Sequence, residues 1–115
     1  MARKGSFREL LVWQRSLDLV GSVYRLTERL PPEERYALQD QARRAAVSVP
    51  ANIAEGQGRQ SLSVARSSLQ ELETLIEIMV RLGYLRGEDT QAVEQETDEI
   101  SRMVVGLMKA VRKRA

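Results

Sequence analysis

The chain has 115 residues, with 18 lysines and arginines, 16 acidic residues and a formal net charge of +2. One domain of this length buries about two thirds of its unfolded surface, so it can fold without a disulfide or a metal. The absence of cysteine and histidine excludes disulfides, thiolate chemistry, Ser-His-Asp nucleophiles and the usual ligands of transition metals. We therefore expect a single domain over residues 1–115 that is not an enzyme and binds no cofactor or metal.

The first residues, MARKGSF, are charged and no apolar stretch follows them, so no signal peptide is predicted. The longest apolar stretch, 75–85, is interrupted by charges and is too short to span a bilayer. We expect a cytoplasmic protein without membrane contact.

The first expected helix covers about residues 7–30. The segment Ser6-Phe7-Arg8-Glu9 has the S-x-x-E spacing of a capping box. Two apolar rows follow with helical spacing, Leu10, Trp13, Leu17, Val20 and Tyr24 in one and Val12, Leu19, Val23, Leu26 and Leu30 in the other. Pro31 and Pro32 stop this helix, and Pro32 suits the first position of the next one.

The second expected helix covers about 32–56 and contains a proline, Pro50. Its apolar row keeps its phase across that proline, with members Leu38, Ala42, Ala45, Val49 and Ile53. A helix that started anew at Pro50 would have no reason to keep this phase, so we expect one helix that is kinked at Pro50. Pro50 leaves the Ala46 carbonyl without its donor, and Ser48 and Asn52 are placed to satisfy backbone groups near the break.

The corner Gly56-Gln57-Gly58 invites comparison with phosphate-binding loops. Those loops follow a strand and continue into a GK[ST] or a third glycine, whereas a helix precedes this corner. We interpret it as a turn that ends the second helix, with Gly56 as a left-handed cap. Arg59 and Arg66 could still project from this corner towards phosphate.

The third helix is expected at about 61–82 and the fourth at about 89–113. Their apolar rows alternate steps of three and four, through Leu62, Ala65, Leu69, Leu72, Ile76 and Met79, and through Val93, Thr97, Ile100, Val104, Leu107 and Val111. Gly83 closes the third helix. Similar lengths and short connections predict an all-α, antiparallel up-down-up-down four-helix bundle.

More apolar residues are present than one bundle core requires. Besides the second row of the first helix, the third adds Leu75, Ile78, Val80 and Leu82, and the fourth adds Val105 and Met108. An exposed apolar surface of this extent favours a homo-oligomer, the alternative being a wide core with scattered surface leucines.

The third helix carries three carboxylates, Glu71, Glu73 and Glu77. Four-helix bundles that hold a pair of metal ions normally use Glu-x-x-His pairs, and this chain has no histidine. Ion pairs are the simpler interpretation. An enzyme that used Glu55, Glu71 or Glu73 would require an enclosed pocket where these groups converge.

Basic residues gather near both ends of the sequence, whereas 88–99 holds six acidic residues and no basic one. Charged helix faces in water are one explanation, and a surface that contacts phosphates is the other. Few aromatic residues are available to stack on bases, so any binding should be directed at the backbone and sensitive to salt. The candidates are Arg3, Lys4, Arg43, Arg44, Arg59, Lys109, Arg112, Lys113 and Arg114.

Several motifs resemble those of the four-helix bundle proteins encoded in intervening sequences of 23S ribosomal RNA genes. The opening matches at Phe7, Leu10, Val12 and Trp13, and the next segment at Pro32, Glu34, Tyr36 and Leu38. The most specific motif matches at Gln41, Arg44, Ala45, Ser48, Val49, Pro50, Asn52, Ile53, Ala54, Glu55 and Gly56. Family members usually carry about two more helical turns after the corner at 56–59, and a loss of about seven residues would preserve the heptad phase.

The resemblance implies a left-handed bundle that assembles as a ring, commonly a pentamer, without enzyme activity. A related protein is the accessory variability protein of diversity-generating retroelements, a basic pentamer that binds a reverse transcriptase and nucleic acid. Our leading hypothesis is a ring-forming bundle that binds RNA or DNA, with structured RNA favoured and a reverse transcriptase as partner. The rival is a protein-interaction scaffold with no direct role in nucleic-acid binding.

Overall fold

The computed structural model describes residues 6–55 and 58–114, which form helices and the turns between them. The four long helices are α1 (Leu11–Thr27), α2 (Leu38–Glu55), α3 (Arg59–Arg81) and α4 (Gly87–Arg114). Two short 3-10 helices, η1 (Phe7–Glu9) and η2 (Pro32–Glu34), precede α1 and α2. The prediction of an all-α, four-helix protein is confirmed. None of these helices is both long and apolar enough to cross a membrane within the described ranges.

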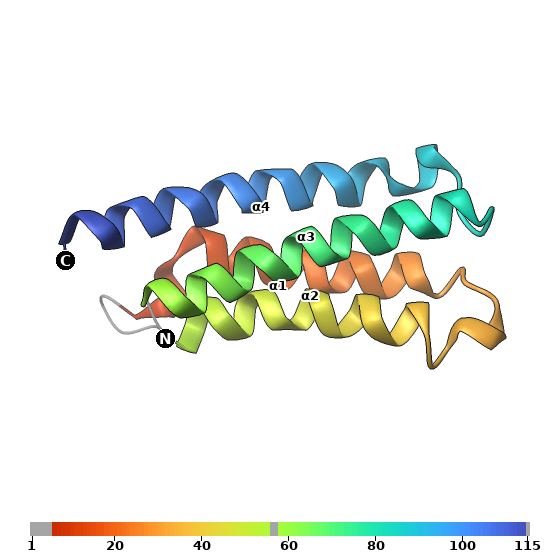
Figure 1. Cartoon of the computed structure of the whole chain (residues 1–115), viewed down its shortest axis with the longest axis horizontal. Coiled ribbons are helices and arrows are strands. Elements are labelled where there is room, and N and C mark those ends of the chain that lie inside the picture. The colour runs from red at the N-terminus through yellow and green to blue at the C-terminus, as the bar shows by residue number, and fades with distance from the viewer. Residues whose placement is uncertain (1–5, 56–57, 115) are drawn as a thin grey trace.

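Each helix packs against two others. α1 and α3 both contact α2 and α4, whereas the described residues show no comparable contact within the diagonal pairs α1–α3 and α2–α4. Figure 1 shows the chain passing back and forth along the 45 Å long axis. The start of α1, the end of α2, the start of α3 and the end of α4 lie together at one end, here called the terminal end. The opposite end, with the α1–α2 and α3–α4 connections, is called the loop end.

The expected first helix is divided. Ser6 caps η1, because its Oγ accepts a hydrogen bond from the Arg8 backbone N–H at 3.0 Å, and Leu10 is then extended (φ −74°, ψ 123°). The Phe7 ring packs edge-on against Trp13, with 5.2 Å between ring centroids, and this contact folds η1 back on α1. α1 ends at Thr27 rather than at residue 30, since the residue before Pro31 is disfavoured in the helical conformation and a turn precedes it.

The expected second helix starts later than predicted. Pro32 opens η2 instead of α2, and α2 begins at Leu38, whose N–H donates to the Glu34 carboxylate at 3.4 Å. From there α2 continues through Pro50 to Glu55 without interruption, as the unbroken phase predicted. The kink at Pro50 stays a prediction, and Gly56 lies outside the described residues.

The polar residues beside Pro50 join α2 to α3. Asn52 Nδ2 donates to the Ser48 carbonyl at 2.8 Å and to Ser48 Oγ at 3.0 Å. Ser68 of α3 donates to the same Ser48 Oγ at 2.9 Å. The acceptor is therefore the carbonyl of Ser48, not that of Ala46, and the serine pair adds a polar link between α2 and α3.

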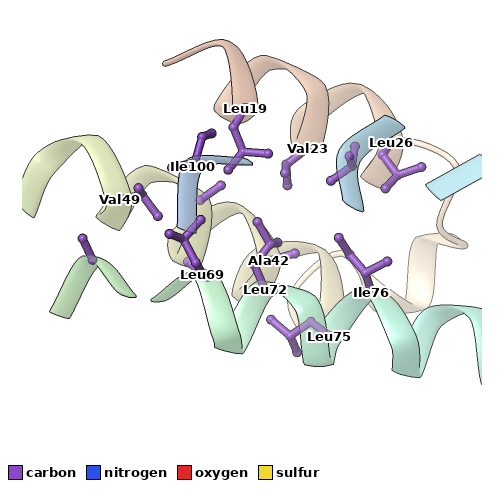
Figure 2. Packing of buried hydrophobic residues seen from close by; sticks show 14 of the residues in the cluster. Leu19, Val23, Leu26, Ala42, Val49, Leu69, Leu72, Leu75, Ile76 and Ile100 are labelled. Atoms are coloured by element: carbon purple, nitrogen blue, oxygen red, sulfur yellow. The ribbon is translucent and has the colours of Figure 1, made fainter. Parts of the chain in front are cut away.

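The hydrophobic core follows the predicted rows. Figure 2 shows Leu19 and Val23 of α1, Val49 of α2, Leu69 of α3 and Ile100 of α4 meeting in the interior. All six members of the α3 row are fully buried or nearly so. The buried row of α1 is Val12, Leu19, Val23, Leu26 and Leu30, and Ser16 occupies its gap with a hydrogen bond to the Trp13 carbonyl.

Only part of the surplus apolar surface is exposed. Leu75 belongs to the core, and Trp13 and Val20 pack against it from the side. Leu17 and Tyr24, from the second row of α1, remain 44% and 40% exposed, and Leu82 is 57% exposed at the loop end.

The α3–α4 connection is tightly specified. Gly83 has φ 81°, and the hydrogen bonds Gly83 N–H to Val80 O and Tyr84 N–H to Met79 O complete a Schellman cap, as the expected stop at Gly83 requires. Tyr84 then donates its hydroxyl to Glu34 at 2.9 Å, which raises the pKa of Tyr84 and ties this connection to η2.

Asp89 holds the start of α4 in place. Its carboxylate accepts the Arg86 N–H at 3.0 Å and pairs with the Arg29 guanidinium at 2.8 Å. The backbone hydrogen bond from Arg86, helped by Arg29, lowers the pKa of Asp89. The stabilisation is thus present above the ordinary aspartate pKa of about 4 and is lost as the pH falls through the lowered value.

We predict that Asp89→Asn lowers the free energy of unfolding at neutral pH, and that the difference from the wild type shrinks below about pH 4. Urea unfolding followed by circular dichroism at pH 7 and pH 3 measures this. Glu88→Gln, which removes the same charge from an exposed neighbour, is the control and should have little effect. An equal difference for Asp89→Asn at both pH values would contradict the assignment.

Candidate nucleic-acid interface

The predicted basic residues do not form one surface. Lys109 and Arg112 are exposed near the end of α4, at the terminal end. Arg43 and Arg44 lie in the first half of α2, towards the loop end. Arg59 opens α3 and 113–114 close α4, so their backbones belong to the terminal end, whereas Arg3 and Lys4 lie outside the described residues. α4 is the longest helix, with 28 residues, and its last turns extend beyond the start of α3 (Figure 1).

A groove between α3 and α4 collects cations from both helices. Arg66 contributes from α3, and Arg102 and Lys109 contribute from α4. A Cβ built at Gly106, which also lines the groove, would meet nothing within 4 Å, so the groove is open at that point. The full lining is Arg66, Gln70, Glu73, Ser101, Arg102, Val105, Gly106 and Lys109.

The cations at the terminal end differ from most others in their pairing. Arg66, Lys109 and Arg112 have no acidic partner in the described part of the chain, although Arg102 pairs with Asp98 on its own helix. Elsewhere the exposed arginines are mostly paired: Arg44 with Asp40 (3.4 Å), Arg81 with Glu77 (2.9 Å) and Arg86 with Glu88 (3.4 Å). An unpaired exposed cation is free to contact a phosphate without first breaking an ion pair.

The Arg43 side chain joins α2 to the end of α1. Its Nε donates to Thr27 Oγ1 at 3.0 Å and one terminal nitrogen donates to the Tyr24 carbonyl at 3.1 Å. The guanidinium also lies 4.3 Å from the centre of the Tyr24 ring. Arg43 thereby satisfies carbonyl and hydroxyl groups at the end of α1, where a positive charge is favoured by the helix dipole.

The carboxylates considered for catalysis do not converge. Glu71 lines a shallow groove along α3 with Ser63, Ser67 and Ser68, whereas Glu73 lines the α3–α4 groove. Glu55 is exposed at the end of α2. Within the described residues, no group of three or more carboxylates is close enough to hold a metal ion.

Sequence reasoning did not identify Arg102 and treated Arg66 only as a neighbour of the glycine corner. A signal was present: Arg59 and Arg66 are seven residues apart, and so are Arg102 and Lys109. Residues seven apart lie two turns apart on one helix face, so each pair marks a basic face. That the faces of α3 and α4 adjoin the same groove follows only from the packing of the two helices.

The fold and this surface define a four-helix bundle whose terminal end carries unpaired cations on α3 and α4. Residues 8–106 match the family described as 23S rRNA-intervening sequence protein. The match covers most of the chain, which therefore belongs to this family. A search of curated proteins gave no significant match.

We predict that Arg43 and Arg44, although adjacent, differ in their effect on stability. Arg43→Met keeps the apolar stem but removes two charged hydrogen bonds and the ring contact, and should lower the free energy of unfolding by about 1–3 kcal/mol. Arg44→Met removes one exposed ion pair and should cost less than about 0.5 kcal/mol. Urea unfolding of both variants measures the difference, and equal losses would show that Arg43 does not anchor α1.

Proposed function

We propose that this chain is a non-catalytic, ring-forming helical bundle of the cytoplasm that binds nucleic acid, with structured RNA as the favoured ligand. The observation that supports this most strongly is the set of unpaired cations at the terminal end, Arg66, Lys109 and Arg112. Arg59, Lys113 and Arg114 belong to the same end by their places in α3 and α4, and extend the basic surface.

The binding would be directed at the sugar-phosphate backbone. Arginine and lysine neutralise phosphates and release counterions, so affinity falls steeply with salt concentration. Among the described residues, the aromatic side chains near the terminal end are Phe7 and Trp13. Their rings pack on each other. They are thus engaged in the fold, which favours contacts to phosphate over stacking on bases.

Ring formation is proposed from the exposed apolar row of α1. Leu17 and Tyr24 stay 44% and 40% exposed in the single chain, although the Arg43 guanidinium covers part of the Tyr24 ring. Association through this row would repeat the basic end around a symmetry axis and multiply its attraction for a polyanion. Resemblance to the accessory variability protein of diversity-generating retroelements suggests a pentamer, with a reverse transcriptase as a further partner.

We predict that Arg66→Gln, Lys109→Gln and Arg112→Gln, combined, lower the affinity for a structured RNA. The slope of log K against log salt should also become shallower by about 2–3. Filter binding between 50 and 300 mM salt measures both quantities. The matched control neutralises three cations at the loop end, Arg35, Arg81 and Arg86, and should leave the slope nearly unchanged.

The proposal would be wrong if the wild-type chain bound RNA no better than an unrelated protein of equal charge at physiological salt. It would also be wrong if the two triple variants lost the same affinity, because net charge rather than the terminal end would then determine binding.

The alternative function is a protein-interaction scaffold, and the same exposed row of α1 favours it. We predict that Leu17→Glu lowers the mass measured by sedimentation at micromolar concentration if the row joins copies of this chain. A wild-type monomer under these conditions would contradict ring formation. If Leu17→Glu leaves the mass unchanged but abolishes capture of another protein, the scaffold is the correct interpretation.

A further inference from the structure

Gly106 is a glycine inside α4 that the fold itself does not require. A Cβ built there would meet nothing within 4 Å, and among the described residues a positive φ occurs only at Gly83. Glycine destabilises the interior of a helix relative to alanine, because it loses more backbone freedom on folding. Neither the packing of α4 nor its backbone conformation therefore accounts for a glycine at this position.

Gly106 lies in the groove between α3 and α4, beside two unpaired cations. The two helices run antiparallel (Figure 1), so the residues that line the groove place Arg66 level with Lys109. By the same register, Gln70 of α3 is level with Gly106. Neither Arg66 nor Lys109 forms an ion pair in the described part of the chain. Two free cations thus border the point at which α4 presents no side chain.

We propose that Gly106 admits one phosphodiester of a nucleic-acid backbone to this groove, where Arg66 and Lys109 neutralise it. This inference rests on the nucleic-acid binding proposed above and names the point of contact. A glycine permits the close approach of a ligand to the backbone of a helix. The fork of the arginine guanidinium fits two phosphate oxygens, and the Gln70 amide and Ser101 hydroxyl line the groove as neutral donors.

The rest of the groove limits the site to a single phosphate. Glu73 lines the groove next to the cations. Towards the loop end the lining carries three more carboxylates, those of Glu77, Glu94 and Asp98. Arg81 and Arg102, which line the groove in this region, are already paired with two of them. A strand that followed the groove would bring its next phosphates against carboxylates, so we expect the strand to cross the groove instead.

Two substitutions of Gly106 test the inference without changing any charge. Alanine and leucine are better helix formers than glycine, so Gly106→Ala should raise the urea midpoint of unfolding and Gly106→Leu should not lower it. The affinity for structured RNA should nevertheless fall, by about two- to threefold for alanine and about tenfold for leucine, because the new side chain occupies the place of the phosphate. Urea unfolding and filter binding at fixed salt measure the two effects.

Gly87 provides the matched control on the same helix. It begins α4 at the loop end, and a Cβ built there would also meet nothing within 4 Å. Gly87→Ala and Gly87→Leu therefore make the same chemical change away from the groove. Both should leave the affinity for RNA unchanged.

Salt dependence and coupling identify the contact that is lost. Gly106→Leu should make the slope of log K against log salt shallower by about one, because one phosphate is no longer neutralised. Combined with Lys109→Gln, it should cost little more affinity than either change alone, since both remove the same contact. Combined with Arg112→Gln, which does not line the groove, the two losses should add.

The inference is wrong if the wild-type chain binds RNA and Gly106→Leu binds it equally well, and the proposed function would then stand with another contact surface. A wild-type chain that does not bind RNA contradicts both. If Gly106→Leu weakens the binding of polyglutamate as much as that of RNA, the groove accepts carboxylates and the assignment to phosphate is overturned. If the leucine variant fails to fold, as judged by circular dichroism, Gly106→Ala decides: weaker binding by a more stable chain supports the inference, and unchanged affinity overturns it.

Discussion

The bundle depends on α2 presenting an unbroken apolar row to the other helices although Pro50 lies inside it. A proline in a helix interior costs about 3 kcal/mol or more, because it removes a hydrogen bond and crowds the preceding turn. Ending α2 there would withdraw Ile53, which is fully buried, and would disturb Val49 and Pro50. Each such large side chain contributes about 1.5–3 kcal/mol when buried, so continuing the helix is the more stable arrangement. Beyond the proline, Ile53 packs in the core and Asn52 donates to Ser48, which also accepts from Ser68, so α2 and α3 meet in a defined rotation.

That rotation determines which side of α3 faces α4, and with it the character of the α3–α4 groove. The buried row of α3, from Leu62 to Met79, points inward, so Arg66, Glu73 and Glu77 are left on the side that borders α4. α4 is acidic in its first half and basic in its second, and it runs antiparallel to α3 along this border (Figure 1). The cations and carboxylates that line the α3–α4 groove thus result from one packing arrangement of the two helices.

The candidate site could be predicted only in part. The clustering of Lys109 and Arg112 near the end of a helix is visible in the sequence, and so is the general expectation of phosphate contacts. Arg43 shows the limit of that reasoning: its charge is equal to that of Arg44, but it lies over Tyr24 and donates to the end of α1. Whether an arginine is free or engaged depends on what the neighbouring helix presents, and no local pattern records this.

The sequence by itself determined the class of fold, the apolar rows of α2, α3 and α4, the continuity of α2 through Pro50 and the stop at Gly83, because helical periodicity and backbone preferences are local properties. It did not determine the break at Leu10, where the contact of Phe7 with Trp13 decides the path of the chain. Nor did it determine the late start of α2 at Leu38, where a hydrogen bond from the Leu38 N–H to Glu34 does so. Only the tertiary structure showed which of the two apolar rows of α1 is buried. Both rows have helical spacing, and the choice between them depends on which face of α1 meets α2 and α4.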